Sequence, residues 1–177
     1  MSVKKFSLAL IMMLGLLVAG CATFPKDDIR IEAEADPTIN FNGYKTYAML
    51  GSAEILNDPE GKWEPPGFDA DAEIEFLISR ELRKLGKSET RANPDMLVAY
   101  ALGVDMAMMK FKDDPEKKVS VLENVPEGAL VIALMDANTE IVTWAAVAVA
   151  ELQNEGDEVA KLRLNYVVTE MFKRLPK

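Results

Sequence analysis

The stretch GALVIALMDANTEIVTWAAVAVA, residues 128–150, decides the fold. It contains two apolar runs rich in β-branched and small residues, 129–135 and 141–150, on either side of the polar segment 136–140. This pattern is typical of two buried strands joined by a short hairpin loop. Strands joined in this way pair in antiparallel fashion. The stretch therefore predicts the centre of an antiparallel sheet.

Further strands are predicted before this hairpin. Residues 96–104 form an apolar run that is typical of a buried strand. Residues 44–50 are rich in tyrosine and threonine, and residues 29–35 alternate between apolar and charged side chains. Because an Asn-Gly turn signal lies between these last two segments, the sequence favours their pairing as a hairpin. Residues 51–67 are predicted to be a long surface loop, and residues 105–123 a loop or an irregular edge.

Two amphipathic helices complete the predicted fold. One begins near Asp71 and the other at Asp157 or a neighbouring residue. The apolar stripes consist of Ile74, Leu77, Ile78, Leu82 and Leu85 in the first helix and of Leu164, Val167, Val168, Met171 and Leu175 in the second. Two such helices cover most simply one face of a sheet. We therefore predict an α+β domain, a two-layer sandwich with a mainly antiparallel sheet of about five strands and two amphipathic helices on one face.

The amino terminus has the layout of a secretory signal. Lys4 and Lys5 precede the apolar run 8–19, which is shorter than the roughly 20 residues that a membrane-spanning helix needs. The run ends in the segment LVAGC, residues 17–21, which resembles the lipobox of bacterial lipoproteins. A secretory signal peptide without lipidation would share only the small residues at the cleavage site. We predict a removed signal at 1–20, a lipidated tether at 21–28 and a single α+β domain at 29–177.

Lipid on Cys21 would hold the mature protein to a membrane, because two or three long acyl chains make attachment effectively permanent. Cys21 is the sole cysteine, so no disulfide forms within the chain. Ala22 stands where an aspartate would resemble a signal for inner-membrane retention in Gram-negative bacteria. The expected location is the periplasmic face of the outer membrane. Removal of two signal lysines leaves 18 basic and 29 acidic residues, a net charge of −11 that disfavours nucleic-acid partners.

Several short motifs together resemble the envelope lipoproteins of the domain of unknown function 4136 family. They are Asp36-Pro37, Asn42-Gly43-Tyr44-Lys45-Thr46-Tyr47-Ala48, Pro94-Asp95-Met96-Leu97-Val98-Ala99-Tyr100, Gly128-Ala129-Leu130-Val131-Ile132, Asp136-Ala137 and Trp144. The chain departs from the family pattern at Ala145-Ala146, where a basic residue and a glycine usually follow the tryptophan. The resemblance implies a lipoprotein of the Gram-negative envelope without an assigned activity.

The composition argues against catalysis. The chain has no histidine, which removes the commonest general base and metal ligand, and after the predicted signal it has neither a G-x-S-x-G nor an S-x-x-K signature. The acidic residues of 69–75 lack the spacing of an EF-hand and suit the start of a helix. We therefore predict a protein that is not an enzyme and needs no cofactor.

Two features remain as candidate binding sites. Trp63 lies in the predicted loop, either as an exposed contact for an envelope protein partner or as a lid folded back on the sheet. The methionines Met96, Met106, Met108 and Met109 offer thioethers that suit Cu(I), although methionine also fills gaps in cores. The leading hypothesis is a non-enzymatic, membrane-anchored lipoprotein with a binding or scaffold role. Its contacts would be the Trp63 loop and residues 105–123, and Cu(I) binding is the alternative.

Overall fold

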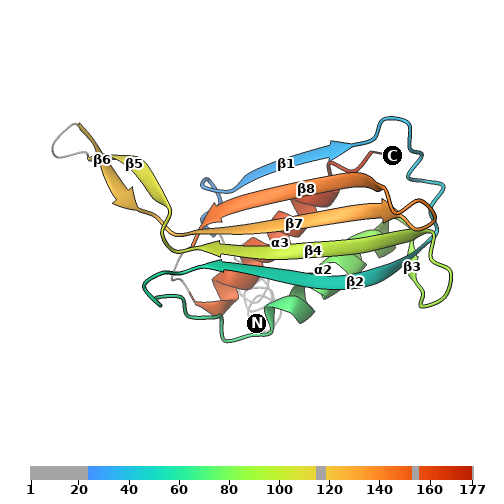
Figure 1. Cartoon of the computed structure of the whole chain (residues 1–177), viewed down its shortest axis with the longest axis horizontal. Helices are drawn as coiled ribbons and strands as arrows, with labels where there is room; N and C mark the ends of the chain where they lie inside the picture. Colours follow the sequence, from blue (N-terminus) through green and yellow to red (C-terminus); the bar gives the residue numbers. More distant parts are fainter. Residues whose placement is uncertain (1–23, 115–118, 153–155, 177) are drawn as a thin grey trace, which may run out of the picture.

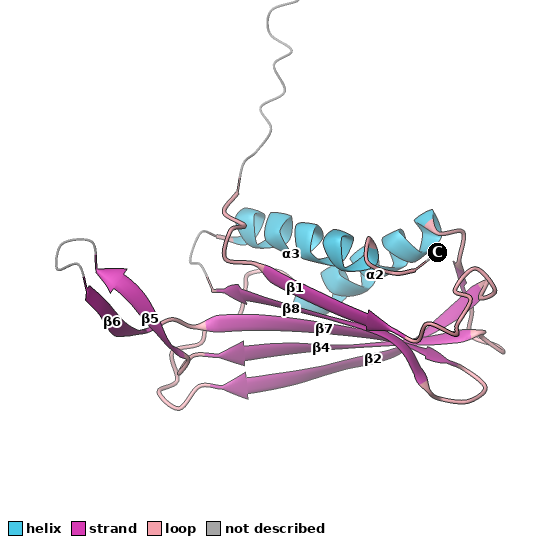
Figure 2. Ribbon diagram, turned by 90° about the horizontal axis from the view of Figure 1, so that it is seen from above, coloured by secondary structure: helices cyan, strands magenta, loops and turns pink. Residues whose placement is uncertain are grey.

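The computed structural model describes residues 24–114, 119–152 and 156–176. The predicted signal and Cys21 lie outside these residues. The strands are β1 (Arg30–Ala35), β2 (Thr46–Asn57), β3 (Ser88–Glu89), β4 (Met96–Asp105), β5 (Met109–Asp114), β6 (Val119–Asn124), β7 (Glu127–Asp136) and β8 (Val142–Glu151), and the helices are α2 (Ala70–Lys84) and α3 (Asp157–Phe172). Both helices lie on one face of the main sheet (Figure 2). Among the described residues, no helix is long and apolar enough to span a membrane.

The main sheet has six strands in the order β1-β8-β7-β4-β2-β3, and β5 and β6 form a separate two-stranded sheet. The predicted hairpin of β7 and β8 lies near its centre, with Val131 opposite Val147. β4 pairs antiparallel with β7, whereas β2 pairs parallel with β4 because α2 crosses between them. The α+β two-layer prediction is confirmed, with six strands in place of about five.

The predicted pairing of the first two strands is wrong. β1 forms one edge of the sheet and pairs antiparallel with β8, so that Ala33 lies opposite Ala146. β2 lies on the far side of β4, so that β8, β7 and β4 separate it from β1. The alternating pattern of β1 identifies which of its side chains face the core, but it carries no information about the neighbouring strand.

The core lies between the helices and the sheet. Trp144 is 1% exposed, and its ring lies 5.5 Å from that of Phe172, measured between centroids. The predicted stripes supply most of the helical side, because Ile74, Leu77 and Ile78 of α2 are fully buried. Val168 and Met171 of α3 are fully buried as well, whereas Leu85, at the end of the first predicted stripe, is 46% exposed. Burial of this apolar surface is the dominant stabilising term of the fold.

The two helices begin differently. The side chain of Asp69 accepts a hydrogen bond from the Ala72 amide at 3.0 Å and caps α2. At α3 the capping position is Gly156, with φ +83°, and not Asp157. The Asp157 carboxylate instead accepts a hydrogen bond from the Gly67 amide at 2.9 Å. It therefore fastens the loop before α2 to the start of α3.

Two predicted loops contain strands. β2 continues to Asn57, past a bulge at Gly51, and its residues 52–57 are exposed. Residues 105–123 contain most of the β5–β6 hairpin, which projects beyond the end of the main sheet (Figure 1). Residues 52–57 are exposed, so they do not show the alternation that marks a half-buried strand.

Candidate functional site

The face of the main sheet that points away from the helices is apolar. We call it the outer face, and by strand alternation and register it comprises Leu97, Ala99, Ala101 and Gly103 of β4, Ala129, Val131, Ala133 and Met135 of β7, and Ala145, Val147 and Val149 of β8. Figure 1 views the molecule from this side, with the helices behind the sheet. Figure 2 shows no described segment covering it.

Carboxylates border the outer face at the free edge. Glu32 and Glu34 of β1 lie opposite Val147 and Ala145 and are exposed. At the other side, Ile55 of β2 is 66% exposed, and Val147 near the centre is 39% exposed. An apolar centre with a charged border is the usual anatomy of a protein interface.

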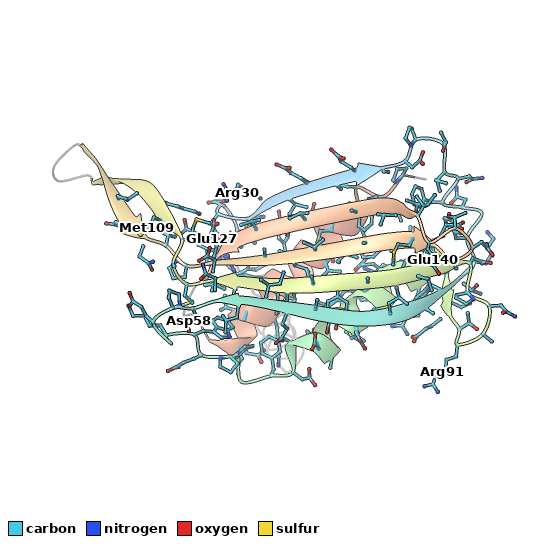
Figure 3. All side chains as sticks on the ribbon, viewed as in Figure 1. Arg30, Asp58, Arg91, Met109, Glu127 and Glu140 are labelled. Carbon is cyan, nitrogen blue, oxygen red and sulfur yellow. The ribbon has the colours of Figure 1, made fainter. Side chains whose placement is uncertain are left out.

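A buried carboxylate fastens the β5–β6 hairpin to one end of this face. Glu127 is 7% exposed and accepts a hydrogen bond from the Arg30 guanidinium at 3.0 Å. Lys110 of β5 forms a second ion pair with Glu127, and its ammonium lies 3.5 Å from Glu151. The hydrogen bond to Glu127 raises the pKa of Lys110. Figure 3 shows Arg30, Glu127 and Met109 at this end, where the hairpin leaves the sheet.

A cavity of about 660 Å³ lies on the opposite side of the same end, between the sheet and α3. Small residues create it: Gly128, Ala148 and Ala150 on the sheet lie below Ala160 of α3. At the other end of the same layer, Trp144 and its bulky neighbours fill the corresponding space. The volume is in the range of small-molecule binding sites, about 300–1,000 Å³.

The loop between β2 and α2 lines the mouth of this cavity. Trp63, Pro66 and Phe68 are half-buried there, and Pro65 between them is exposed. Asp58 holds the loop, because its carboxylate accepts hydrogen bonds from the amides of Trp63 at 2.7 Å and Lys62 at 3.0 Å. These hydrogen bonds lower the pKa of Asp58. Trp63 therefore packs against the fold and covers part of the cavity.

Residues 24–28 of the predicted tether lie beside the same cavity. Arg163 of α3 is 9% exposed and lines the cavity wall. It donates hydrogen bonds to the Asp28 carboxylate at 2.5 and 3.1 Å and to the Pro25 carbonyl. Burial alone raises the pKa of Asp28, but the hydrogen bond and charge of Arg163 outweigh it and leave that pKa lowered. Phe24 packs edge-on against Tyr166 of α3, with ring centroids 5.7 Å apart.

The structure does not gather the four predicted methionines. Met96 is fully buried at the start of β4, and Met106 follows the end of that strand, about 30 Å away at the rise of an extended chain. Met106 lines the cavity, and Met109 is 48% exposed on β5. In the described part of the chain, no group of three or more histidine, cysteine or acidic residues is arranged to hold a metal ion.

The acidic residues of 69–75 serve the start of α2. Asp69 is its cap, and Asp71 accepts a hydrogen bond from the Tyr100 hydroxyl at 2.9 Å. Burial, together with the nearby Asp71 carboxylate, raises the pKa of Tyr100. These residues join the helix to the sheet.

Sequence reasoning missed the Arg163–Asp28 pair and the cavity. The pair joins residues 135 positions apart, so no local sequence pattern predicts it. The only available signal for the cavity was the alanine-rich composition of β8, which the sequence predicts only as a buried strand.

The fold and these sites define an α+β domain of two layers with one uncovered sheet face. The chain belongs to the family described as domain of unknown function (DUF4136), whose model matches residues 31–177, and the resemblance noted in the sequence is thereby confirmed. The family carries no assigned activity, and no curated protein matched the chain.

Solved structures share the fold. A DUF4136 family protein of Bacteroides thetaiotaomicron VPI-5482 is 10% identical, with a TM-score of 0.54 and coverage of 84% of this chain and 96% of that one. A PelC dodecamer from Paraburkholderia phytofirmans is 14% identical, with a TM-score of 0.51 and coverage of 84% and 99%. At these identities the similarity establishes the fold alone.

Proposed function

We propose that the protein is a non-enzymatic lipoprotein of the cell envelope, anchored through acylated Cys21, that acts as a scaffold by assembling with further copies of itself. The observation that carries this proposal is the outer face, an apolar surface across three neighbouring strands that no described segment covers. Exposed apolar surfaces of this kind on folded proteins mark sites of association.

A second copy is the partner that this surface favours. The centre of the outer face contains only small and aliphatic side chains, so it offers shape and apolar area but no charge for a partner to match. Two such faces bury each other's apolar area as the two sheets of a β-sandwich do. The PelC protein of P. phytofirmans, which has this fold, is described as a dodecamer, and that precedent supports assembly.

The proposal of a lipid anchor rests on the sequence of the first 21 residues. A basic start, a short apolar run and LVAGC at its end support acylation of Cys21 and attachment to the outer membrane's periplasmic face. The absence of histidine and the coupling of the buried charges to one another support a binding role without catalysis.

The test compares two lysine substitutions in the full-length protein, made at apolar residues on opposite sides of the molecule. Val147→Lys lies on the outer face, whereas Phe76→Lys alters a residue of α2 that is 55% exposed on the helical side. Crosslinking in living cells, read by immunoblot, should show self-linked species for the native protein and Phe76→Lys but not for Val147→Lys. Membrane fractionation of Cys21→Ser reports the anchor separately. Unchanged self-linking in Val147→Lys, or a native protein without acyl groups, would contradict the proposal.

A further inference from the structure

The cavity behind the sheet is suited to a long apolar ligand. Its sheet side consists of Gly128, Ala148 and Ala150, and Leu102 and Leu130 extend the apolar wall toward the core. Interiors of folded proteins are close-packed, so an apolar space of about 660 Å³ that opens at the surface is an exception within this layer.

The charged groups at the wall do not select a polar ligand. The charge of Arg163 is neutralised by Asp28, and the Asp157 carboxylate accepts a hydrogen bond from the Gly67 amide. Lys62 at the mouth pairs with Glu60 at 2.5 Å. Glu151 pairs with Lys110, and Glu64 is exposed to solvent, so the buried part of the wall offers apolar contact in place of a headgroup site.

The amino-terminal segment brings the predicted lipidation site, Cys21, close to the cavity. Ile29 lines the cavity, and Arg163 on the same wall holds Pro25 and Asp28. Phe24 is held against α3 as well. Cys21 is three residues further, which is at most about 11 Å of extended chain. An acyl chain attached to Cys21 therefore starts within a short distance of the cavity mouth.

We propose that the cavity holds one acyl chain of the lipid on Cys21. This inference rests on the acylation proposed above and adds a site for its lipid. The remaining acyl chains of the lipid stay in the membrane. The sheltered chain fixes the cavity end of the domain at the membrane surface, so the tether sets the orientation of the domain as well as its location.

The experiment uses the full-length protein in cells fed a palmitate analogue with a photoreactive diazirine at its methyl end. After illumination and purification, intact-mass measurement reports acylation of Cys21, and peptide mass spectrometry locates the crosslinks. The expected product joins the acylated Cys21 peptide to peptides that contain Trp63 or Ala160.

A cavity-filling variant and a matched control accompany it. Ala160→Trp places an indole in the cavity and should reduce these crosslinks about tenfold, because excluding even two methylenes costs that much in affinity. Ala72→Trp makes the same change at an exposed position of α2 and should leave them unchanged. If Ala160→Trp does not fold, Ala160→Phe introduces a smaller ring at the same place, and the native crosslinks remain the primary measurement.

The outcomes separate the two proposals. An acylated Cys21 without crosslinks in the cavity overturns the inference and leaves the proposed function standing. Crosslinks there that carry only phospholipid also overturn it, because the occupant is then another lipid. A Cys21 that carries no acyl group overturns both.

Discussion

Arg163 is the residue on which the tether, α3 and the end of β8 converge. Its guanidinium reaches Asp28, the Pro25 carbonyl and the Glu151 carbonyl, and it is almost fully buried. A buried ion pair adds little stability compared with an apolar pair, but removal of one partner leaves an uncompensated charge. The geometry of the amino-terminal segment therefore depends on Asp28 remaining ionised.

This dependence predicts how stability changes with pH. The pKa of Asp28 is lowered in the folded state, so its contribution to stability is present above the pKa of the unfolded chain and is lost as pH falls through the folded value. We expect Asp28→Asn to lower the free energy of unfolding by about 2 kcal/mol at pH 7. We also expect it to reduce the loss of stability that the native protein shows below about pH 5.

Urea unfolding of Cys21→Ser proteins at several pH values measures both effects. Glu158→Gln is the control, because Glu158 lies at the same end of α3 but its side chain is 90% exposed and pairs with Lys161 only at 3.7 Å. That variant should follow the native pH profile. If Asp28→Asn does so as well, Arg163 does not hold the tether through this charge.

At the scale of elements, the sequence predicted those strands and helices that touch the core. β4, β7 and β8 were identified because burial leaves an apolar run, and α2 and α3 because one face of each is buried. The β5–β6 hairpin was missed because it lies outside the main sheet and its alternating runs, residues 109–112 and 119–121, are short. The pairing of β1 with β8 was missed because it depends on which strand edge is free, a property of the whole sheet.

The candidate site was predictable only in part. Trp63 was identified from its loop composition, and its two interpretations could not be separated without the cavity that it covers. That cavity needs Gly128, Ala148 and Ala160 to meet from three different elements. Each of the three is unremarkable in its own segment, and only the topology brings them together.

The β5–β6 hairpin is predicted to be dispensable for folding. Asp105 and Glu127 are register partners at the ends of β4 and β7, so a two-residue Asn-Gly turn can join them in place of residues 106–126. A lone two-stranded hairpin is marginally stable, and the main sheet does not include it. We expect the free energy of unfolding to fall by about 3 to 4 kcal/mol, from the lost pair between Lys110 and Glu127 and from the lost burial of Val125, which is 7% exposed.

Thermal unfolding followed by circular dichroism, on the Cys21→Ser form, tests this expectation. Lys110→Met is the matched control, because it removes the same ion pair and keeps the hairpin. A midpoint for Lys110→Met between those of the native and the shortened protein would separate the effect of the ion pair from that of the lost Val125. A shortened protein without a cooperative transition would show instead that the hairpin belongs to the folding unit.

At the scale of the whole molecule, the anchor and the outer face lie on opposite sides of the sheet. Phe24 packs on α3, so the chain reaches the domain from the helical side, whereas the outer face points the other way (Figure 2). A lipid on Cys21 therefore leaves the outer face free for a second copy. Anchoring and assembly use separate surfaces, so a separate substitution can disrupt each of them.

The membrane that holds the protein is predicted to depend on the residue after Cys21. Ala22 lacks the carboxylate that resembles an inner-membrane retention signal, so the native protein should sediment with the outer membrane on a sucrose gradient. Ala22→Asp should move most of it to the inner-membrane fraction without altering the domain, because residue 22 precedes the first described contact at Phe24. Ala22→Ser is the control and should keep the native distribution. An outer-membrane location for Ala22→Asp would show that residue 22 does not direct sorting, while a native protein released without detergent would show that no lipid anchor is present.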